Sequence, residues 1–352
     1  MERKVGFFCF KDKSARLICA LFALTLMLPQ ICLAGEEPEI QGQDAVQQQS
    51  EIQEVQEKTE APNQADSQEN REDPNAPDMS ATLVAPIIPT YLPIIMYHQI
   101  SRESSKLGAY VISDAEFEAD MKLLHDNGYT TVTIKDLLAY VNKEGILPEK
   151  PVMLTFDDGF QSDYVYALPI LKKYNMKAIF SIIGKYTDEN SDEKTPRHVN
   201  YSHLSWDEIK EMQSSGLAEF QCHTYDMHDM SKRKGALRKW SESAEDYRQH
   251  VLEDLGKLSQ ACLEHIGVAP TAFTCPFGCY SDQLGEILKE FGFPAIMHSY
   301  QRMNILTGNP DELYILKRFL RTHNKDVSEW VAKWNELFKE PIEDVKKAEK
   351  KI

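Results

Sequence analysis

Side chains that can bind a metal ion or transfer protons directly follow several short apolar segments of the sequence. Asp157 and Asp158 come after the segment Val152–Phe156, and Gly159 comes next. Two adjacent carboxylates repel each other, and a bound cation relieves that repulsion. An isolated Asp-Asp-Gly is more typical of a solvated turn, so the pair must be judged together with the other segments.

Two histidines have a comparable position. His223 follows the apolar segment Ala218–Cys222, and His228 comes five residues later. That spacing does not align two side chains on one helix face, but it suits one ligand at a strand end and one on the next loop. Either histidine alone would more often be an ordinary core or surface residue. Together with Asp158 they have the composition of a hydrolytic zinc site, so we predict a site for Zn²⁺ or another divalent transition metal.

The same arrangement recurs at two further segments. His98 follows Pro93–Tyr97, and Pro276-Phe277-Gly278 follows the segment Ala272–Cys275. Polar residues meet in this way when the segments are parallel strands, because the carboxyl ends of such strands lie at one edge of the sheet.

The rest of the sequence supports strands of that kind, because short apolar segments alternate with amphipathic ones. The predicted strands are Pro93–Tyr97, Thr130–Ile134, Val152–Phe156, Ala178–Ile183, Ala218–Cys222, Ala272–Cys275, Pro294–Met297 and Tyr314–Leu316. The predicted helices are Asp114–Asn127, Ile134–Val141, Tyr164–Tyr174, Trp206–Ser214, Ala244–His265, Asp282–Phe291 and Val327–Leu337. Capping boxes are predicted at Ser113 with Glu116 and at Ser205 with Glu208. We therefore predict an α/β fold, a distorted (β/α)7-type barrel with a parallel sheet.

Composition divides the chain into four parts. Residues 1–34 combine a basic start with a 12-residue apolar run, which predicts a signal peptide, with an uncleaved membrane anchor as the alternative. Residues 35–90 form a Gln-rich acidic linker that we expect to be disordered. Residues 91–340 hold the predicted catalytic domain, and 341–352 form a charged tail. The protein is therefore expected to be exported, to the periplasm, the cell surface or the medium.

The net charge bears on possible binding partners, and the spacing of the cysteines bears on metal binding. The formal net charge is −16, which argues against nucleic acid because phosphate binding needs basic patches. The cysteines beyond the signal region lack the paired spacing of a zinc site, so we expect structural thiols rather than ligands. They are Cys222, Cys262, Cys275 and Cys279.

The motifs as a whole resemble the NodB-like polysaccharide deacetylases of carbohydrate esterase family 4. The resemblance covers residues 92–320 and rests on Thr155-Phe156-Asp157-Asp158-Gly159, His223-Thr224 and Cys275-Pro276-Phe277-Gly278. The branch that deacetylates poly-β-1,6-N-acetylglucosamine in biofilms is the most similar, because of the histidine spacing, Met96-Tyr97-His98 and Phe160-Gln161-Ser162. Peptidoglycan, chitin and acetylated xylan are alternative substrates, and a glycan-binding pseudoenzyme is an alternative of another class.

The resemblance implies a role for each site residue. Asp158, His223 and His228 would bind the metal, Asp157 would be the general base, and His98 the general acid. The backbone N–H of Phe277 would stabilise the oxyanion, at a position where the family usually has tyrosine.

One family feature is missing, because Thr274-Cys275 stands where an arginine usually orients the catalytic aspartate. Arg318 is the candidate substitute, with an ordinary structural arginine as the alternative. His323 is the second candidate for the acid. Tyr225 and Phe277 are predicted to form a wall against the sugar.

Overall fold

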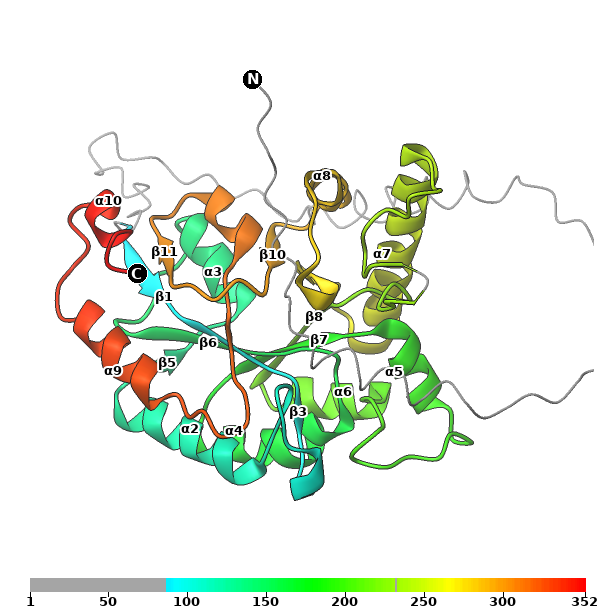
Figure 1. Cartoon of the computed structure of the whole chain (residues 1–352), viewed down its shortest axis with the longest axis horizontal. Coiled ribbons are helices and arrows are strands. Elements are labelled where there is room, and N and C mark those ends of the chain that lie inside the picture. The colour runs from blue at the N-terminus through cyan, green and yellow to red at the C-terminus, as the bar shows by residue number, and fades with distance from the viewer. Residues whose placement is uncertain (1–86, 232) are drawn as a thin grey trace, which may run out of the picture. The chain divides into compact units, whose positions relative to one another are not determined.

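A curled parallel sheet organises residues 87–231 and 233–352, which are the residues that the computed structural model describes. The strands follow the order β10-β9-β8-β7-β6-β2-β12, and β5 pairs with β6. Figure 1 labels β5, β6, β7, β8 and β10 of this sheet. Every one of these pairs is parallel. The bounds are β2 Ile94–Tyr97, β5 Thr130–Thr131, β6 Pro151–Phe156, β7 Ala178–Ile182, β8 Ala218–Cys222, β9 Ala272–Thr274, β10 Ala295–Met297 and β12 Phe319–Leu320. The predicted α/β fold with a barrel-like parallel sheet is confirmed.

The predicted signal segment and residues 35–86 of the predicted linker lie outside the described residues. Within the described ranges, no helix is both long enough and apolar enough to span a membrane.

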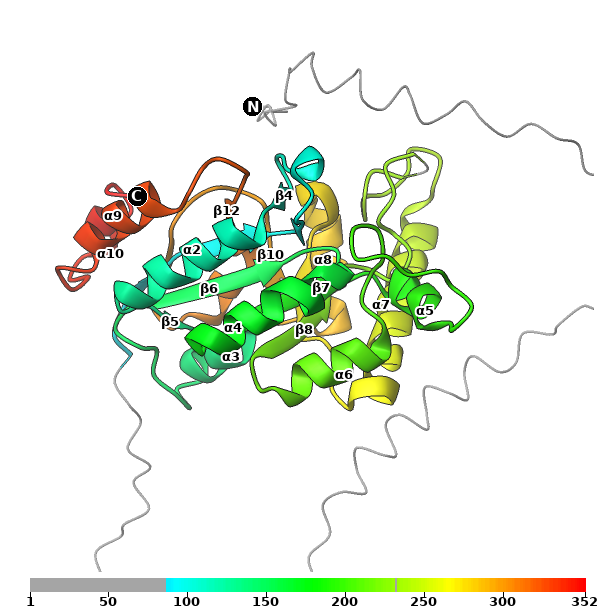
Figure 2. The same ribbon diagram turned by 90° about the horizontal axis from the view of Figure 1, so that it is seen from below.

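Helices cover the sheet, as its apolar strands require. All residues of β6 and β7 are buried, which is typical of parallel strands packed on both faces. Figure 2 shows α2, α4 and α6 side by side along one face of the sheet. The helix bounds are α2 Asp114–Asp126, α3 Ile134–Val141, α4 Leu168–Tyr174, α5 Gly184–Ser191, α6 Trp206–Ser214, α7 Ala244–Ile266, α8 Asp282–Phe291, α9 Ser328–Leu337 and α10 Val345–Ala348.

Both predicted capping boxes are present. At the start of α2, the Ser113 hydroxyl accepts the Glu116 N–H at 3.2 Å, and the Glu116 carboxylate accepts the Ser113 N–H at 2.8 Å. Ser205 and Glu208 do the same for α6. Each box satisfies backbone N–H groups that a helix start leaves unpaired, so these two helix starts followed from sequence.

Two predicted strands are wrong in part or in full. Thr130–Ile134 ends as a strand at Thr131, because the Asp136 carboxylate accepts the Thr133 N–H at 2.8 Å and α3 begins there. Tyr314–Leu316 is no strand, because Pro310–Ile315 forms a 3₁₀ helix, η5. Proline favours the first helical turn, and the Asn309 side chain accepts the Asp311 N–H.

Several elements were not predicted. A π-helical turn, η3 (Asp163–Ala167), replaces the first turn of the helix predicted from Tyr164. β1 (Thr90–Leu92) pairs antiparallel with β11 (Asn304–Leu306), and β3 (Gln99–Ile100) pairs with β4 (Val111–Ile112). These strands are too short to show an alternating pattern of apolar and polar residues in the sequence.

The two edges of the sheet meet at the segment that follows η5. Leu316 forms a parallel bridge with Met297 of β10, and β12 pairs with β2. Arg318 lies between these two contacts, and its backbone N–H donates to the Tyr300 carbonyl at 2.8 Å. We call Leu316–Leu320 the closing segment.

A buried ion pair holds α2 against the chain just after the closing segment. Arg321 donates to Asp120 through Nε at 2.6 Å and Nη2 at 3.2 Å, and both side chains are 1% exposed. The Tyr97 hydroxyl donates to the same carboxylate. Removal of the carboxylate would leave the buried guanidinium without its bidentate partner, with the Glu116 carboxylate 3.7 Å from Nη1 and the Thr322 carbonyl as its remaining acceptors.

We therefore expect Asp120→Ala to lower the free energy of unfolding by about 3–5 kcal/mol, measured by chemical denaturation. Glu118→Ala, on the same helix, removes a solvent-accessible ion pair with Lys173 and should cost below about 1 kcal/mol. Equal effects of the two variants would contradict the role of the buried pair.

Candidate active site

Asp157 is held by a bidentate ion pair. Arg318 donates from Nη1 to Oδ1 at 2.6 Å and from Nη2 to Oδ2 at 2.8 Å. The guanidinium is itself fixed, because Nε donates to the His298 carbonyl and Nη1 also donates to the Thr155 hydroxyl. Paired parallel bonds of this kind fix the plane and orientation of a carboxylate. The two fixing contacts, from Thr155 and His298, were not predicted.

The ion pair also sets the charge of Asp157. Burial alone raises the pKa of the carboxyl group, but the charge and hydrogen bonds of Arg318 outweigh it, so the pKa lies below its ordinary value. Asp157 is therefore ionised near neutral pH and can accept a proton.

Asp158, His223 and His228 meet at one point beside this pair. Asp158 Oδ1 lies 3.4 Å from Nε2 of His223 and 3.3 Å from Nε2 of His228. One ligand atom from each residue falls within 4.8 Å of the others. Among the described residues this is the one group of three or more ligand-type side chains so close together, and it contains no cysteine. The four cysteines beyond the signal region are free thiols.

The tautomer of His223 suits metal binding. Its Nδ1 lies 2.9 Å from the Thr274 carbonyl, which can only accept, so Nδ1 carries a proton and the neutral form of the ring has its lone pair on Nε2. Metal-binding histidines are usually oriented by such a bond. Burial lowers the pKa of His223, but the hydrogen bond to Asp158 and the charges of the two aspartates outweigh it, so the pKa lies above its ordinary value. A bound cation would take the place of the Nε2 proton. Burial lowers the pKa of His228 to about 4, so that ring is neutral at pH 7. The donor set thus fits Zn²⁺ or a similar ion.

His98 and His323, the two candidate acids, have different surroundings. Nε2 of His98 lies 4.0 Å from Asp157 Oδ2, and its ring packs edge-on against Tyr110. Burial lowers the pKa of His98, although the two aspartates oppose this effect. Nδ1 of His323 lies 2.9 Å from the Glu116 carboxylate, at the capping box of α2. Of the two candidates, His98 thus lies beside Asp157, whereas His323 lies at the start of α2.

Phe277 and Tyr225, the predicted wall residues, differ in their contacts. The Phe277 ring is 49% exposed and lies 4.3 Å from the His228 ring, so it borders the cluster of Asp158, His223 and His228. The Tyr225 hydroxyl donates to Asp188 of α5, and its ring packs near Lys257. Phe277 is thus the better placed of the two to touch a ligand at this cluster.

Each of the three motifs contains a residue other than glycine in the left-handed backbone region. Asp158, Thr224 and Phe277 have φ values of 73°, 74° and 57°. Such residues each cost about 1–3 kcal/mol and gather at functional sites. Gly159 follows with φ 67°, and a Cβ there would come within 2.9 Å of Ile182. The strained turns direct the side chains that follow β6, β8 and β9 toward one centre.

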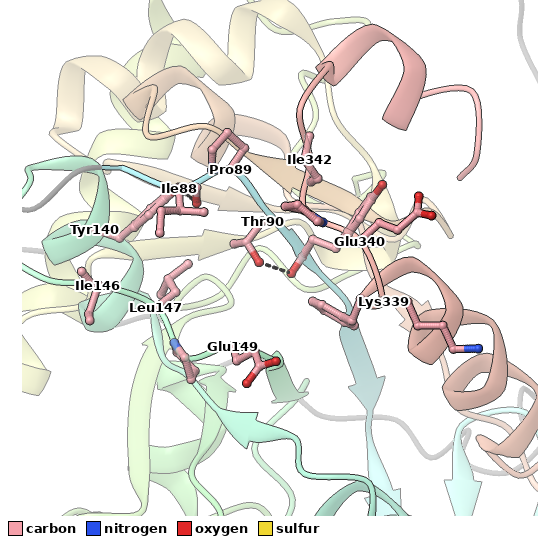
Figure 3. Close-up of a pocket in the computed structure, with 14 residues that line it drawn as sticks. Ile88, Pro89, Thr90, Tyr140, Ile146, Leu147, Glu149, Lys339, Glu340 and Ile342 are labelled. Carbon is pink, nitrogen blue, oxygen red and sulfur yellow. Dashed lines mark hydrogen bonds between the residues drawn. The ribbon is translucent and has the colours of Figure 1, made fainter.

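An apolar cavity of about 470 Å³ lies apart from this centre (Figure 3). Its walls include Ile88, Tyr140 and Leu147 and the chain after α9, around Glu340 and Ile342. None of the residues of the candidate site lines it.

Comparison with known proteins agrees with the geometry. A family model described as polysaccharide deacetylase matches residues 144–296. Poly-β-1,6-N-acetyl-D-glucosamine N-deacetylase of Staphylococcus aureus (strain MRSA252) is 30% identical over 236 residues, which are 63% of this chain and 77% of that protein.

Two solved structures share the fold. IcaB from Ammonifex degensii is 28% identical, with a TM-score of 0.57 over 69% of this chain and 96% of that one. A de-N-acetylase from Aggregatibacter actinomycetemcomitans is 24% identical, with a TM-score of 0.58 over 66% and 95% of the two chains.

Proposed function

Since the chain belongs to the polysaccharide deacetylases, hydrolases of amide bonds, we propose that it removes acetyl groups from poly-β-1,6-N-acetylglucosamine with a bound divalent metal ion. The observation that carries the proposal is the cluster of Asp158, His223 and His228 beside the ionised Asp157. The choice of polymer rests on the similarity to the staphylococcal enzyme.

In this proposal Asp158, His223 and His228 hold the metal ion, with Zn²⁺ as the first expectation. When bound, the ion would polarise the acetyl carbonyl group and lower the pKa of a water molecule. Two imidazoles and one carboxylate, with a water molecule as the fourth ligand, are a usual donor set of hydrolytic zinc sites.

The protein's own residues would then move the protons. Asp157 accepts a proton as the water oxygen bonds to the carbonyl carbon, and Arg318 keeps the carboxylate ionised and oriented. His98 passes a proton to the nitrogen as the carbon–nitrogen bond breaks, so that acetate and a free amine leave. Nε2 of His98 lies 4.0 Å from Asp157 Oδ2, so the proposed acid and base are neighbours. The Phe277 N–H would donate to the oxyanion formed on the carbonyl oxygen, and its ring would contact the sugar.

We further propose that the protein is exported. The polymer expected as its substrate lies outside the cytoplasm, and the basic and apolar sequence of residues 1–34 is typical of an export signal.

The substrate assignment can be tested with defined oligosaccharides. We expect the full-length, metal-loaded protein to release acetate from β-1,6-linked N-acetylglucosamine oligomers faster than from chitin oligomers, peptidoglycan or acetylated xylan, as measured by an acetate assay and mass spectrometry. Equal or faster release from any of the other three substrates would contradict the proposed polymer.

A further inference from the structure

A carboxylate that is not one of the three proposed metal ligands holds the loop between His223 and His228. Asp254, in the middle of α7, accepts two successive backbone N–H groups of this loop. Its Oδ1 accepts from Tyr225 and its Oδ2 from Asp226, each at 2.7 Å. Hydrogen bonds to an ionised acceptor are short and roughly twice as strong as neutral ones. Asp254 therefore links Tyr225 and Asp226, which lie between His223 and His228, to helix α7.

The same loop is under backbone strain just before these contacts. Thr224 has φ 74°, a conformation that is especially unfavourable for a β-branched residue. Its hydroxyl accepts the Met227 N–H at 3.2 Å, which tightens the turn toward His228. A turn of this kind persists only where its surroundings hold it, and the two bonds to Asp254 lie immediately after the strained residue.

A second anchor limits movement of the loop on the other side. The Tyr225 hydroxyl donates to Asp188 of α5 at 2.7 Å. A Cβ atom at Gly184, where α5 begins, would come within 2.5 Å of the Tyr225 ring, so the ring lies directly on the backbone there. At the start of α5 the N–H groups of Gly184 and Lys185 also donate to the Thr224 and Tyr225 carbonyls, at 3.1 and 3.0 Å. The loop is thus fixed from α5 through its carbonyl groups and the Tyr225 side chain, and from α7 through its N–H groups, for which Asp254 is the acceptor.

We propose that Asp254 is a positioning residue that sets the metal affinity of the site by holding His228 at its distance from Asp158. Since this rests on the proposed metal site, it concerns affinity and not the chemical step. Metal ligands must be placed within about 0.2 Å, and His228, unlike His223, does not directly follow a strand. Without the two bonds from Asp254 the strained turn can relax, and the imidazole moves away from the other ligands.

The test compares two variants of the full-length protein with a matched control. Asp254→Ala removes both acceptors, and Asp254→Asn leaves a single acceptor oxygen for the two N–H groups. We expect the Kd for Zn²⁺, from competition with a chromophoric chelator, to rise by about 10–100-fold in Asp254→Ala and by less in Asp254→Asn. Activity at saturating Zn²⁺ should recover toward that of the wild type. The neighbour Glu253, which contacts Gln249 on the same helix, provides the control Glu253→Gln, with an unchanged Kd.

A purely structural role would lower the melting temperature without changing the Kd for Zn²⁺, and that result would overturn the inference. Should Asp254→Ala fail to fold, Asp254→Asn decides between the same two outcomes. His228→Ala separates this inference from the proposed function. If His228→Ala loses Zn²⁺ while both Asp254 variants bind it as the wild type does, the role of Asp254 alone is wrong.

Discussion

Asp157→Asn is expected to lower kcat/KM for deacetylation by about 10²–10⁴-fold while the protein keeps its metal. Asparagine has nearly the same shape as aspartate, but its amide oxygen is a far weaker base and cannot accept the proton from water. It also replaces one oxygen of the bidentate contact with Arg318 by an amide that cannot accept a hydrogen bond. Initial rates of acetate release and metal content per chain measure the two parts of this prediction.

Asp207→Asn is the matched control for that variant. Asp207 lies on α6 with its side chain 93% exposed and pairs only at the surface with Lys210. The same chemical change should leave kcat/KM unaltered there. Turnover of Asp157→Asn at the wild-type rate would remove Asp157 as the base.

Loss of either histidine should abolish metal binding. His223→Ala and His228→Ala each leave two protein ligands, fewer than the three that hydrolytic zinc sites retain. We expect the metal content of the purified protein, determined by elemental mass spectrometry, to fall from one ion per chain to nearly none. Deacetylation should fall with it and should not return when Zn²⁺ is added at a concentration that saturates the wild type.

His125→Ala controls for the removal of an imidazole. His125 lies on α2 with its side chain 59% exposed and contacts Asp126, so this variant should bind metal as the wild type does. Wild-type metal content in both His223→Ala and His228→Ala would show that the ligand assignment is wrong.

Local sequence signals predicted the elements that position the site. The alternation of apolar strands and amphipathic helices gave the parallel sheet, and the capping boxes at Ser113 and Ser205 marked two helix starts. The same alternation predicted that β2, β6, β8 and β9 are parallel. The residues that follow these strands therefore lie together, at the edge of the sheet formed by the carboxyl ends of the strands. The roles of those residues stay predictions until the variants are measured.

Contacts between distant segments could not be predicted in this way. Asp254 is an ordinary aspartate on an amphipathic helix, and nothing near it in the sequence indicates that its partners are the peptide groups of Tyr225 and Asp226. The left-handed conformation of Thr224 is imposed by the turn and contradicts the preference of a β-branched residue. The segment around Leu316 looked like a strand because its apolar residues are buried, although Pro310 begins a 3₁₀ helix there.

The closing segment affects when, during synthesis and folding, the ion pair of Asp157 can form. Asp157 and Arg318 are 161 residues apart in the chain, so the carboxylate leaves the ribosome long before its counter-charge. Contacts between such distant residues form late in folding, since the intervening loop must first be closed. A truncated chain that lacks Arg318 would bring an unneutralised carboxylate to the sheet edge, where burial raises its pKa. Deacetylation would therefore begin only when the chain has been completed and its sheet edges have joined.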